Sequence, residues 1–79
     1  MIVRTKDIRE YIESLKQLAK NNGQAYLDLV SLDIHKDLNL KNRMPMVCNA
    51  MRQVMDKNDL ILHQTPSGYS STLKIRYYL

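Results

Sequence analysis

The sequence lacks several features on which whole classes of protein depend. Its single cysteine, Cys48, cannot form a disulfide within the chain, which argues against a disulfide-stabilised secreted scaffold. No apolar run approaches the roughly 18 residues that a membrane-spanning helix needs, and the N-terminal residues lack the apolar core of a signal peptide. We therefore expect a cytoplasmic protein that is not associated with a membrane.

The motifs that mark common enzymes are also missing. The chain contains no Walker loop, no other Gly-rich phosphate loop, no paired-carboxylate motif and no nucleophile elbow. The two histidines, His35 and His63, have no cysteine or carboxylate at the spacing of a metal site. Cys48 falls on an apolar helix face, where we expect a small buried hydrophobe rather than a nucleophile. The sequence therefore predicts no catalysis, no cofactor and no bound metal.

Length and composition indicate one folded unit. The 79 residues suffice for a single domain, residues 1–79, with a core too small to enclose a large substrate cavity. Apolar residues make up 44% of the chain and charged residues 25%, which is ordinary for a globular protein and far from a disordered composition.

Positive charge is concentrated in one segment. The formal net charge is +4, and residues 41–57 carry four basic side chains and one acidic side chain. Residues 23–40, in contrast, carry one basic and three acidic side chains. An excess of this size is common in proteins that bind nothing anionic, so its location is more informative than its magnitude.

Residues 31–55 are the stretch around which the chain is organised. We predict a helix over residues 31–38, a turn over 39–42 and a second helix over 43–55, with Pro45 in its first turn. A helical wheel separates this second helix into two faces. The inner face is apolar: Met44, Val47, Cys48, Ala50, Met51, Val54 and Met55. The outer face holds Met46, Asn49, Arg52 and Gln53. Side-chain amides and guanidinium groups read adenine and guanine edges in the major groove, so we interpret residues 43–55 as a DNA-recognition helix.

The flanking segments complete the predicted secondary structure. A first helix begins with Thr5 as its N-cap, ends near Lys20, and has an apolar stripe of Ile8, Tyr11, Ile12, Leu15, Leu18 and Ala19. Its other face, Lys6, Arg9, Glu10, Glu13, Lys16, Gln17 and Lys20, mixes both signs and is expected to be solvated. Residues 26–30 read as a short strand, although they could instead begin the next helix, which Ser31 would cap. Strands over residues 60–64 and 73–79 flank a polar loop and form a hairpin, with Leu73, Ile75, Tyr77 and Leu79 on one face of the last strand.

This order of elements resembles the winged helix-turn-helix superfamily. The resemblance lies in the segments SLDIHKDLNL, NRMPMVCNAMRQVM and LILHQTPSGYSSTLKIRYYL, which match the pattern of the superfamily rather than an exact motif. It implies an α+β fold with three helices, a short first strand and a C-terminal β-hairpin wing. It also implies that the third helix enters the major groove, while the wing touches the DNA backbone or minor groove. The wing departs from the basic pattern of many DNA-binding wings, because residues 64–73 contain no lysine or arginine.

The candidate DNA-binding residues follow from this resemblance and from the charge pattern. Asn49 and Gln53 would read bases, and Met46 would contact a thymine methyl group or a protein partner. The full set is Lys41, Asn42, Arg43, Met46, Asn49, Arg52, Gln53, Lys57, Ser70, Ser71, Lys74 and Arg76. Its basic members would neutralise phosphates, and the wing hydroxyls would meet the backbone. Each of these residues could equally be an ordinary surface residue.

Two classes of function stay open from the sequence. The first is a module that binds double-stranded DNA, such as a small transcriptional regulator. The second is a winged-helix interaction domain that binds protein in a larger nucleic-acid-processing complex, which Met46, Tyr69, Tyr78 and the uncharged wing favour. RNA binding is a lesser alternative. Since a lone module buries roughly 600 to 1,000 Å² on DNA, a homodimer or a protein partner is plausible, held through the first helix or residues 77–79.

Overall fold

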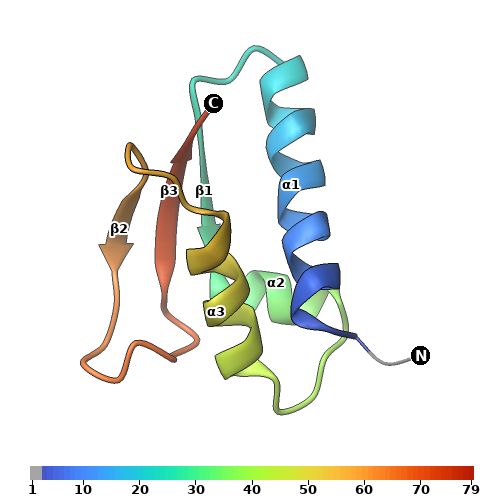
Figure 1. The fold of residues 1–79 in the computed structure, drawn as a ribbon, viewed down its shortest axis with the longest axis vertical. Coiled ribbons are helices and arrows are strands. Elements are labelled where there is room, and N and C mark those ends of the chain that lie inside the picture. The colour runs from blue at the N-terminus through green and yellow to red at the C-terminus, as the bar shows by residue number, and fades with distance from the viewer. Residues whose placement is uncertain (1–2) are drawn as a thin grey trace.

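A computed structural model describes residues 3–79 as three helices and three strands (Figure 1). In chain order these are α1 (Thr5–Asn21), β1 (Tyr26–Val30), α2 (Ser31–Asp37), α3 (Met44–Val54), β2 (Leu60–His63) and β3 (Lys74–Tyr78). The strands form one antiparallel sheet in the order β1-β3-β2, so the last strand of the chain is the middle strand of the sheet. The expected α+β domain with a C-terminal hairpin is confirmed, as is the strand at residues 26–30. Within residues 3–79, none of the helices has the length and apolar character of a membrane span.

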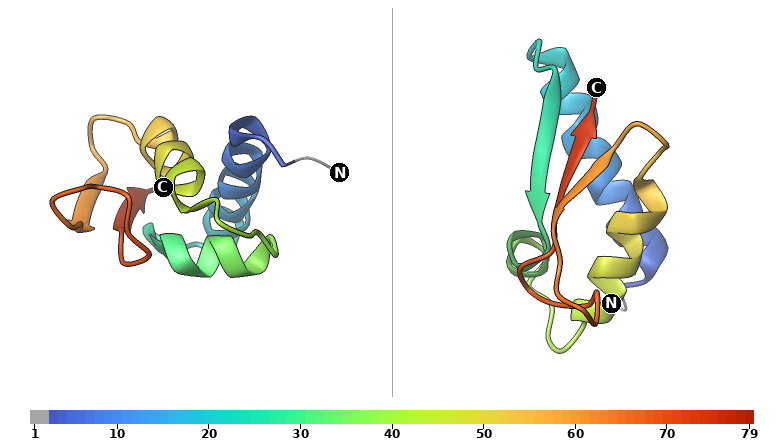
Figure 2. Two further views of the ribbon diagram at one scale, coloured as in Figure 1. Left: turned by 90° about the horizontal axis from the view of Figure 1, so that it is seen from below. Right: turned by 90° about the vertical axis from the view of Figure 1, so that its left-hand side faces the viewer.

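The helices pack on one side of this sheet. The right-hand view of Figure 2 shows α1 and α3 on the same side of the strands, and the left-hand view shows α2 lying crosswise to both. The inward residues of β3, Ile75 and Tyr77, stand opposite Leu29 and Leu27 of β1 in the antiparallel register. Because side chains alternate along a strand, the other face of the sheet is left to Tyr26, Asp28 and their neighbours.

The core draws on every helix and on the end of the chain. Its buried members are Ile8, Ile12, Ile34, Val47, Cys48, Ala50, Met51, Leu73, Ile75 and Tyr77. The predicted burial of Leu73 and Ile75 is confirmed, since both are fully inaccessible. One member of the expected α1 stripe is wrong: Leu18 is 59% exposed. The 3.6-residue repeat places Leu18 to one side of the line through Ile8, Ile12 and Ala19, beyond the reach of the core.

Two predicted helix caps are replaced by other contacts. Arg4, not Thr5, precedes the first turn of α1, and its backbone N–H donates to the Asp7 carboxylate at 2.8 Å. Ser31 is not the cap of α2 either, since Val30 takes that position and the Ser31 hydroxyl donates to the Ser70 carbonyl at 2.7 Å. Predicted and observed element ends otherwise differ by one residue, with the exception of the turn before α3, which extends to Arg43.

Two asparagines shape the turn between α2 and α3. Asn39 and Asn42 both have a φ of 53°, the left-handed conformation that asparagine tolerates better than most residues. The Leu40 N–H donates to the His35 carbonyl at 3.0 Å and so closes the end of α2. This geometry reverses the chain within a few residues and sets α3 against α2.

An ion pair joins β1 to β3 on the open face of the sheet. The Arg76 guanidinium donates to both carboxylate oxygens of Asp28, at 2.8 and 3.0 Å, and lies 4.1 Å from the centre of the Tyr26 ring. The pair holds the pKa of Asp28 below its ordinary value, chiefly through this hydrogen bonding. Arg76 was expected to neutralise phosphate, but here its charge is already matched by a carboxylate.

Truncating the buried face of β3 tests the core. Leu73→Ala or Ile75→Ala should lower the free energy of unfolding by about 2 to 4 kcal/mol, because each leaves a cavity in a closed core. Leu62→Ala is the control, since Leu62 is 40% exposed and its loss should cost less than about 1 kcal/mol. Urea denaturation measures all three. Equal, small losses would contradict the packing described here.

The Asp28–Arg76 pair predicts a specific dependence of stability on pH. Because the pKa of Asp28 is lowered in the folded state, the stabilisation is fully present above the unfolded pKa of about 3.9 and is lost as the pH falls through the folded value. The difference in unfolding free energy between wild type and Asp28→Asn should therefore be steady near neutral pH and shrink in acid. In an Arg76→Gln background the same substitution should lose this pH dependence. A dependence that survives in that background would assign it to another group.

Candidate nucleic-acid interface

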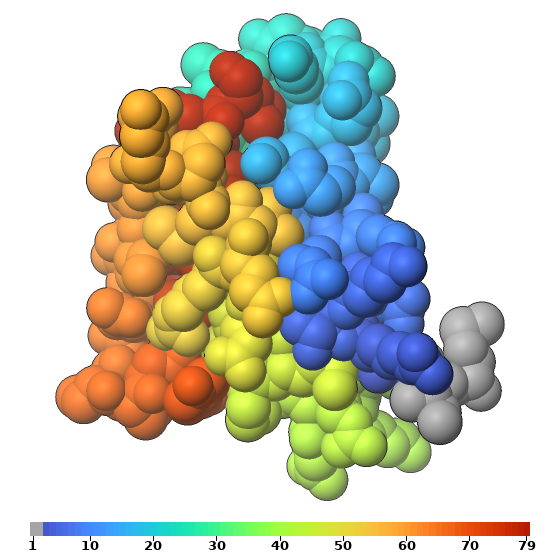
Figure 3. Space-filling model, viewed as in Figure 1, coloured from blue at the N-terminus to red at the C-terminus, as the bar shows by residue number. Residues whose placement is uncertain are grey.

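Helix α3 is fixed to the molecule through its inner face. Val47, Ala50 and Met51 are buried, which confirms the predicted apolar sector. The Tyr77 hydroxyl donates to the Met51 carbonyl at 2.8 Å, and the Cys48 thiol approaches the Ser70 carbonyl at 3.5 Å. Burial raises the pKa of Cys48, so its thiol stays protonated and serves as a donor. The opposite face of α3 is consequently turned outward, and Figure 3 shows it between the β2 hairpin and α1.

Asn49 occupies the middle of that outward face. It is exposed, and the helical repeat puts Arg52 and Gln53 on either side of it. Met46 was expected among these outward residues, but it is half-buried and packs against the core. Met46 lies at the border between the two sectors of the helix, where its long, flexible side chain turns inward. The exposed polar face is therefore narrower than the sequence indicated.

Arg52 is engaged by the hairpin loop, which we define as residues 64–73. Its Nη2 donates to the Gln64 side-chain oxygen at 3.2 Å, and its guanidinium carbon lies 5.6 Å from the centre of the Tyr69 ring. Gly68 lies beneath the same group with a φ of +75°, and a Cβ there would come within 2.9 Å of Nη2. Three residues of the loop thus converge on one guanidinium. Arg52 acts as a strut between α3 and the loop.

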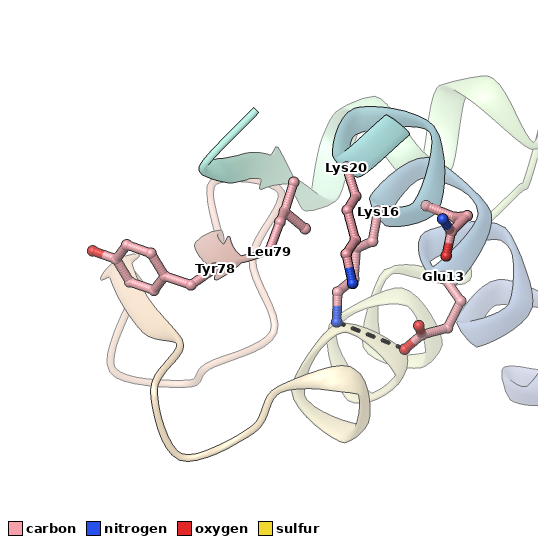
Figure 4. Close-up of a pocket in the computed structure, with 6 residues that line it drawn as sticks. Glu13, Lys16, Lys20, Tyr78 and Leu79 are labelled. Atoms are coloured by element: carbon pink, nitrogen blue, oxygen red, sulfur yellow. Dashed lines mark ion pairs between the residues drawn. The ribbon is translucent and has the colours of Figure 1, made fainter. Parts of the chain in front are cut away.

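Gln53 is engaged on the other side, by α1. The Arg9 guanidinium donates to the Gln53 side-chain oxygen, and both residues line a surface hollow of about 500 Å³ between the two helices. The face of α1 that was expected to be solvated is thus partly used for packing, because Arg9 and Lys16 are half-buried. The Lys16 ammonium lies 5.4 Å from the centre of the Tyr77 ring and 3.9 Å from Glu13. Figure 4 shows Lys16 and Lys20 reaching toward Tyr78 and Leu79 at the end of β3.

Exposed cations lie at both ends of α3. Lys41 and Arg43 precede the helix and Lys57 follows it, all three exposed. Arg43 is anchored by its backbone, whose N–H donates to His35 Nε2 at 3.3 Å, and its guanidinium donates to the neighbouring Asn42 carbonyl at 3.3 Å. Lys74 is half-buried on β3. The three exposed cations are therefore the groups best placed to meet an anionic surface beside α3.

The serines of the hairpin loop have structural roles that the sequence did not reveal. The Ser70 carbonyl accepts from Ser31 and Cys48, and the Ser70 hydroxyl is bonded to Thr72 at 2.7 Å. The Ser71 carbonyl accepts the Leu32 N–H at 3.2 Å. Ser70 and Ser71 were expected to meet phosphates, but their polar groups are largely used in tying the loop to α2 and α3. Of the wing hydroxyls considered, Tyr69 is on an exposed side chain.

No group of three or more His, Cys, Asp or Glu side chains within residues 3–79 is arranged to hold a metal ion. Comparisons with protein-family models, with curated proteins and with solved structures find no match to this chain.

Removing the strut tests how the hairpin loop is positioned. Arg52→Ala should speed amide hydrogen exchange in residues 64–69, because the loop loses a stacking contact and a hydrogen bond worth about 1 kcal/mol together. Amides of β3 should keep their protection. Arg43→Ala is the matched control, since it removes an arginine near α3 that has no contact with the loop among those described. Unchanged exchange in Arg52→Ala would show that the loop is held by its serine anchors alone.

Proposed function

We propose that the chain is a winged helix-turn-helix module that binds double-stranded DNA, with α3 in the major groove, and that it acts as a small transcriptional regulator. The order of elements supports this fold: α2 and α3 are joined by a tight turn, and a β-hairpin follows them. The hairpin loop would be the wing, and Arg52 would set its angle to α3. An α-helix fits the major groove when its outer face is polar and free of bulky packing, as the face around Asn49 is.

The observation that carries the proposal is the isolation of Asn49. Its neighbours Arg52 and Gln53 are held to the two sides, toward the hairpin loop and α1, while Asn49 is exposed between them. A side-chain amide in this position offers one donor and one acceptor, the pair that an adenine edge requires. We therefore assign Asn49 the central base contact and give Arg52 and Gln53 flanking, positioning roles.

Phosphate contacts come from Lys41, Arg43 and Lys57. They bracket α3 at its two ends, so a duplex lying along the outward face would meet cations on either side of the base contacts. Each such contact releases counterions, which makes affinity depend on salt concentration.

Two alanine variants separate base reading from phosphate attraction. A preferred site is first selected from a random duplex library with the wild-type protein. Asn49→Ala should then weaken that site by about 1 to 3 kcal/mol and leave binding to random duplex nearly unchanged. Arg43→Ala should weaken all duplexes alike and flatten the plot of log K against log salt by about one unit.

Lys20→Ala is the control for charge alone, because Lys20 lies near the far end of α1 and should change neither quantity. Parallel loss of preferred and random DNA in Asn49→Ala would remove the base contact. A library that yields no enriched site, together with binding indifferent to salt, would overturn DNA binding. That outcome would favour a protein partner at the uncharged hairpin loop, where Tyr69 is 47% exposed.

A further inference from the structure

The most exposed large apolar side chain of the described residues lies beside an apolar hollow. Leu18 is 59% exposed on α1. The hollow next to it measures about 170 Å³ and lies between the second half of α1 and β1. Its apolar lining is Leu15, Leu18, Ala19, Leu27 and Leu29. Apolar surface of this kind is stabilised when another apolar group covers it.

The surroundings of the hollow carry no charge. All the residues that line it are apolar apart from two neutral amides, Asn22 and Gln24. This is unusual for a chain with a net charge of +4, in which a quarter of the residues are charged. Two identical copies repel each other through their net charge, so they can approach closely only where both surfaces are neutral. The hollow offers such a surface.

The shape of this surface also fits a copy of itself. A two-fold symmetric contact brings the same patch of both copies together, so each patch must contain both a projection and its receptor. Leu18 is the projection and the hollow beside it is the receptor. A cavity of about 150 Å³ lined by apolar side chains accepts a group as large as benzene, so 170 Å³ is enough for the four carbons of a leucine side chain.

The hollow lies on the flank of α1 turned away from the proposed DNA-binding face. Arg9, on one flank, contacts Gln53 of α3, whereas Tyr11, on the opposite flank, donates to Asp37 of α2 at 2.9 Å. The helical repeat places Leu18 on the same flank as Tyr11. A contact through Leu18 would therefore leave α3 and its bracketing cations accessible.

From these observations we infer that the chain forms a two-fold symmetric homodimer in which the Leu18 side chain of each copy enters the α1–β1 hollow of the other. The contact is small compared with a stable protein–protein interface, so the dimer forms at high protein concentration and dissociates on dilution. Its formation needs no DNA and stands independently of the proposed function.

Sedimentation velocity on the whole chain, without DNA, tests the inference. From low micromolar to millimolar concentration, the mass of the wild type should rise from 9.3 kDa toward twice that value. Leu18→Lys places two charges in the neutral contact and removes both leucines, so its dimer dissociation constant should be about 100-fold higher. Its circular dichroism and thermal midpoint should match the wild type, because Leu18 lies outside the core.

Leu60→Lys is the matched control. Leu60 is also an exposed leucine, at 49%, but it lies on β2, an edge strand of the sheet. This variant should dimerise as the wild type does. On dilution, the wild-type amide chemical shifts that change should be those of residues 15–29. A wild type that stays monomeric throughout, a Leu18→Lys variant that dimerises normally, or a loss confined to Leu60→Lys would each overturn the inference, and the last would place the contact at the edge of the sheet.

Discussion

Tyr77 is buried on the middle strand of the sheet, and its hydroxyl satisfies a backbone carbonyl in the last turn of α3. That carbonyl, of Met51, lacks the usual partner four residues on, because the Met55 N–H is bonded to Arg52 instead. One phenol therefore completes the end of α3 while its ring fills the core. Since β3 also pairs with both other strands, the orientation of α3 relative to the sheet is set by a single strand. Burial raises the pKa of Tyr77 and keeps this hydroxyl protonated.

A second junction fixes the other end of the same helix. Ser31, fully buried at the start of α2, and Cys48 of α3 both donate to the Ser70 carbonyl in the hairpin loop. The Ser31 N–H also donates to the Leu73 carbonyl at 2.9 Å. Three segments that are distant in sequence thus meet at one short stretch of backbone. A buried polar group that lost its partner here would cost about 1 to 3 kcal/mol, so the junction selects one arrangement of α2, α3 and the loop.

Local periodicity was sufficient to predict most of the fold. The two faces of α3 and the alternation of Leu73, Ile75 and Tyr77 follow from repeats of 3.6 and 2 residues, which the sequence displays directly. The errors concern contacts between distant residues and side chains at sector borders. Arg9 and Gln53 are 44 positions apart and Ser31 and Ser70 are 39 apart, so no local pattern links them. Met46 and Leu18 lie at the edges of apolar sectors, where the shape of the neighbouring element decides which way a side chain turns.

These long-range contacts change what the outward face of α3 can do. A free arginine and a free glutamine would each lose rotamer entropy on meeting a ligand, whereas Arg52 and Gln53 are already ordered by Tyr69, Gln64 and Arg9. The hairpin loop is ordered by the same contacts, so its angle to α3 is set before any partner arrives. An interface built in this way recognises a rigid, regular surface better than a deformable one. The major groove of a duplex is such a surface, and the conformational cost of fitting α3 to it is largely met during folding.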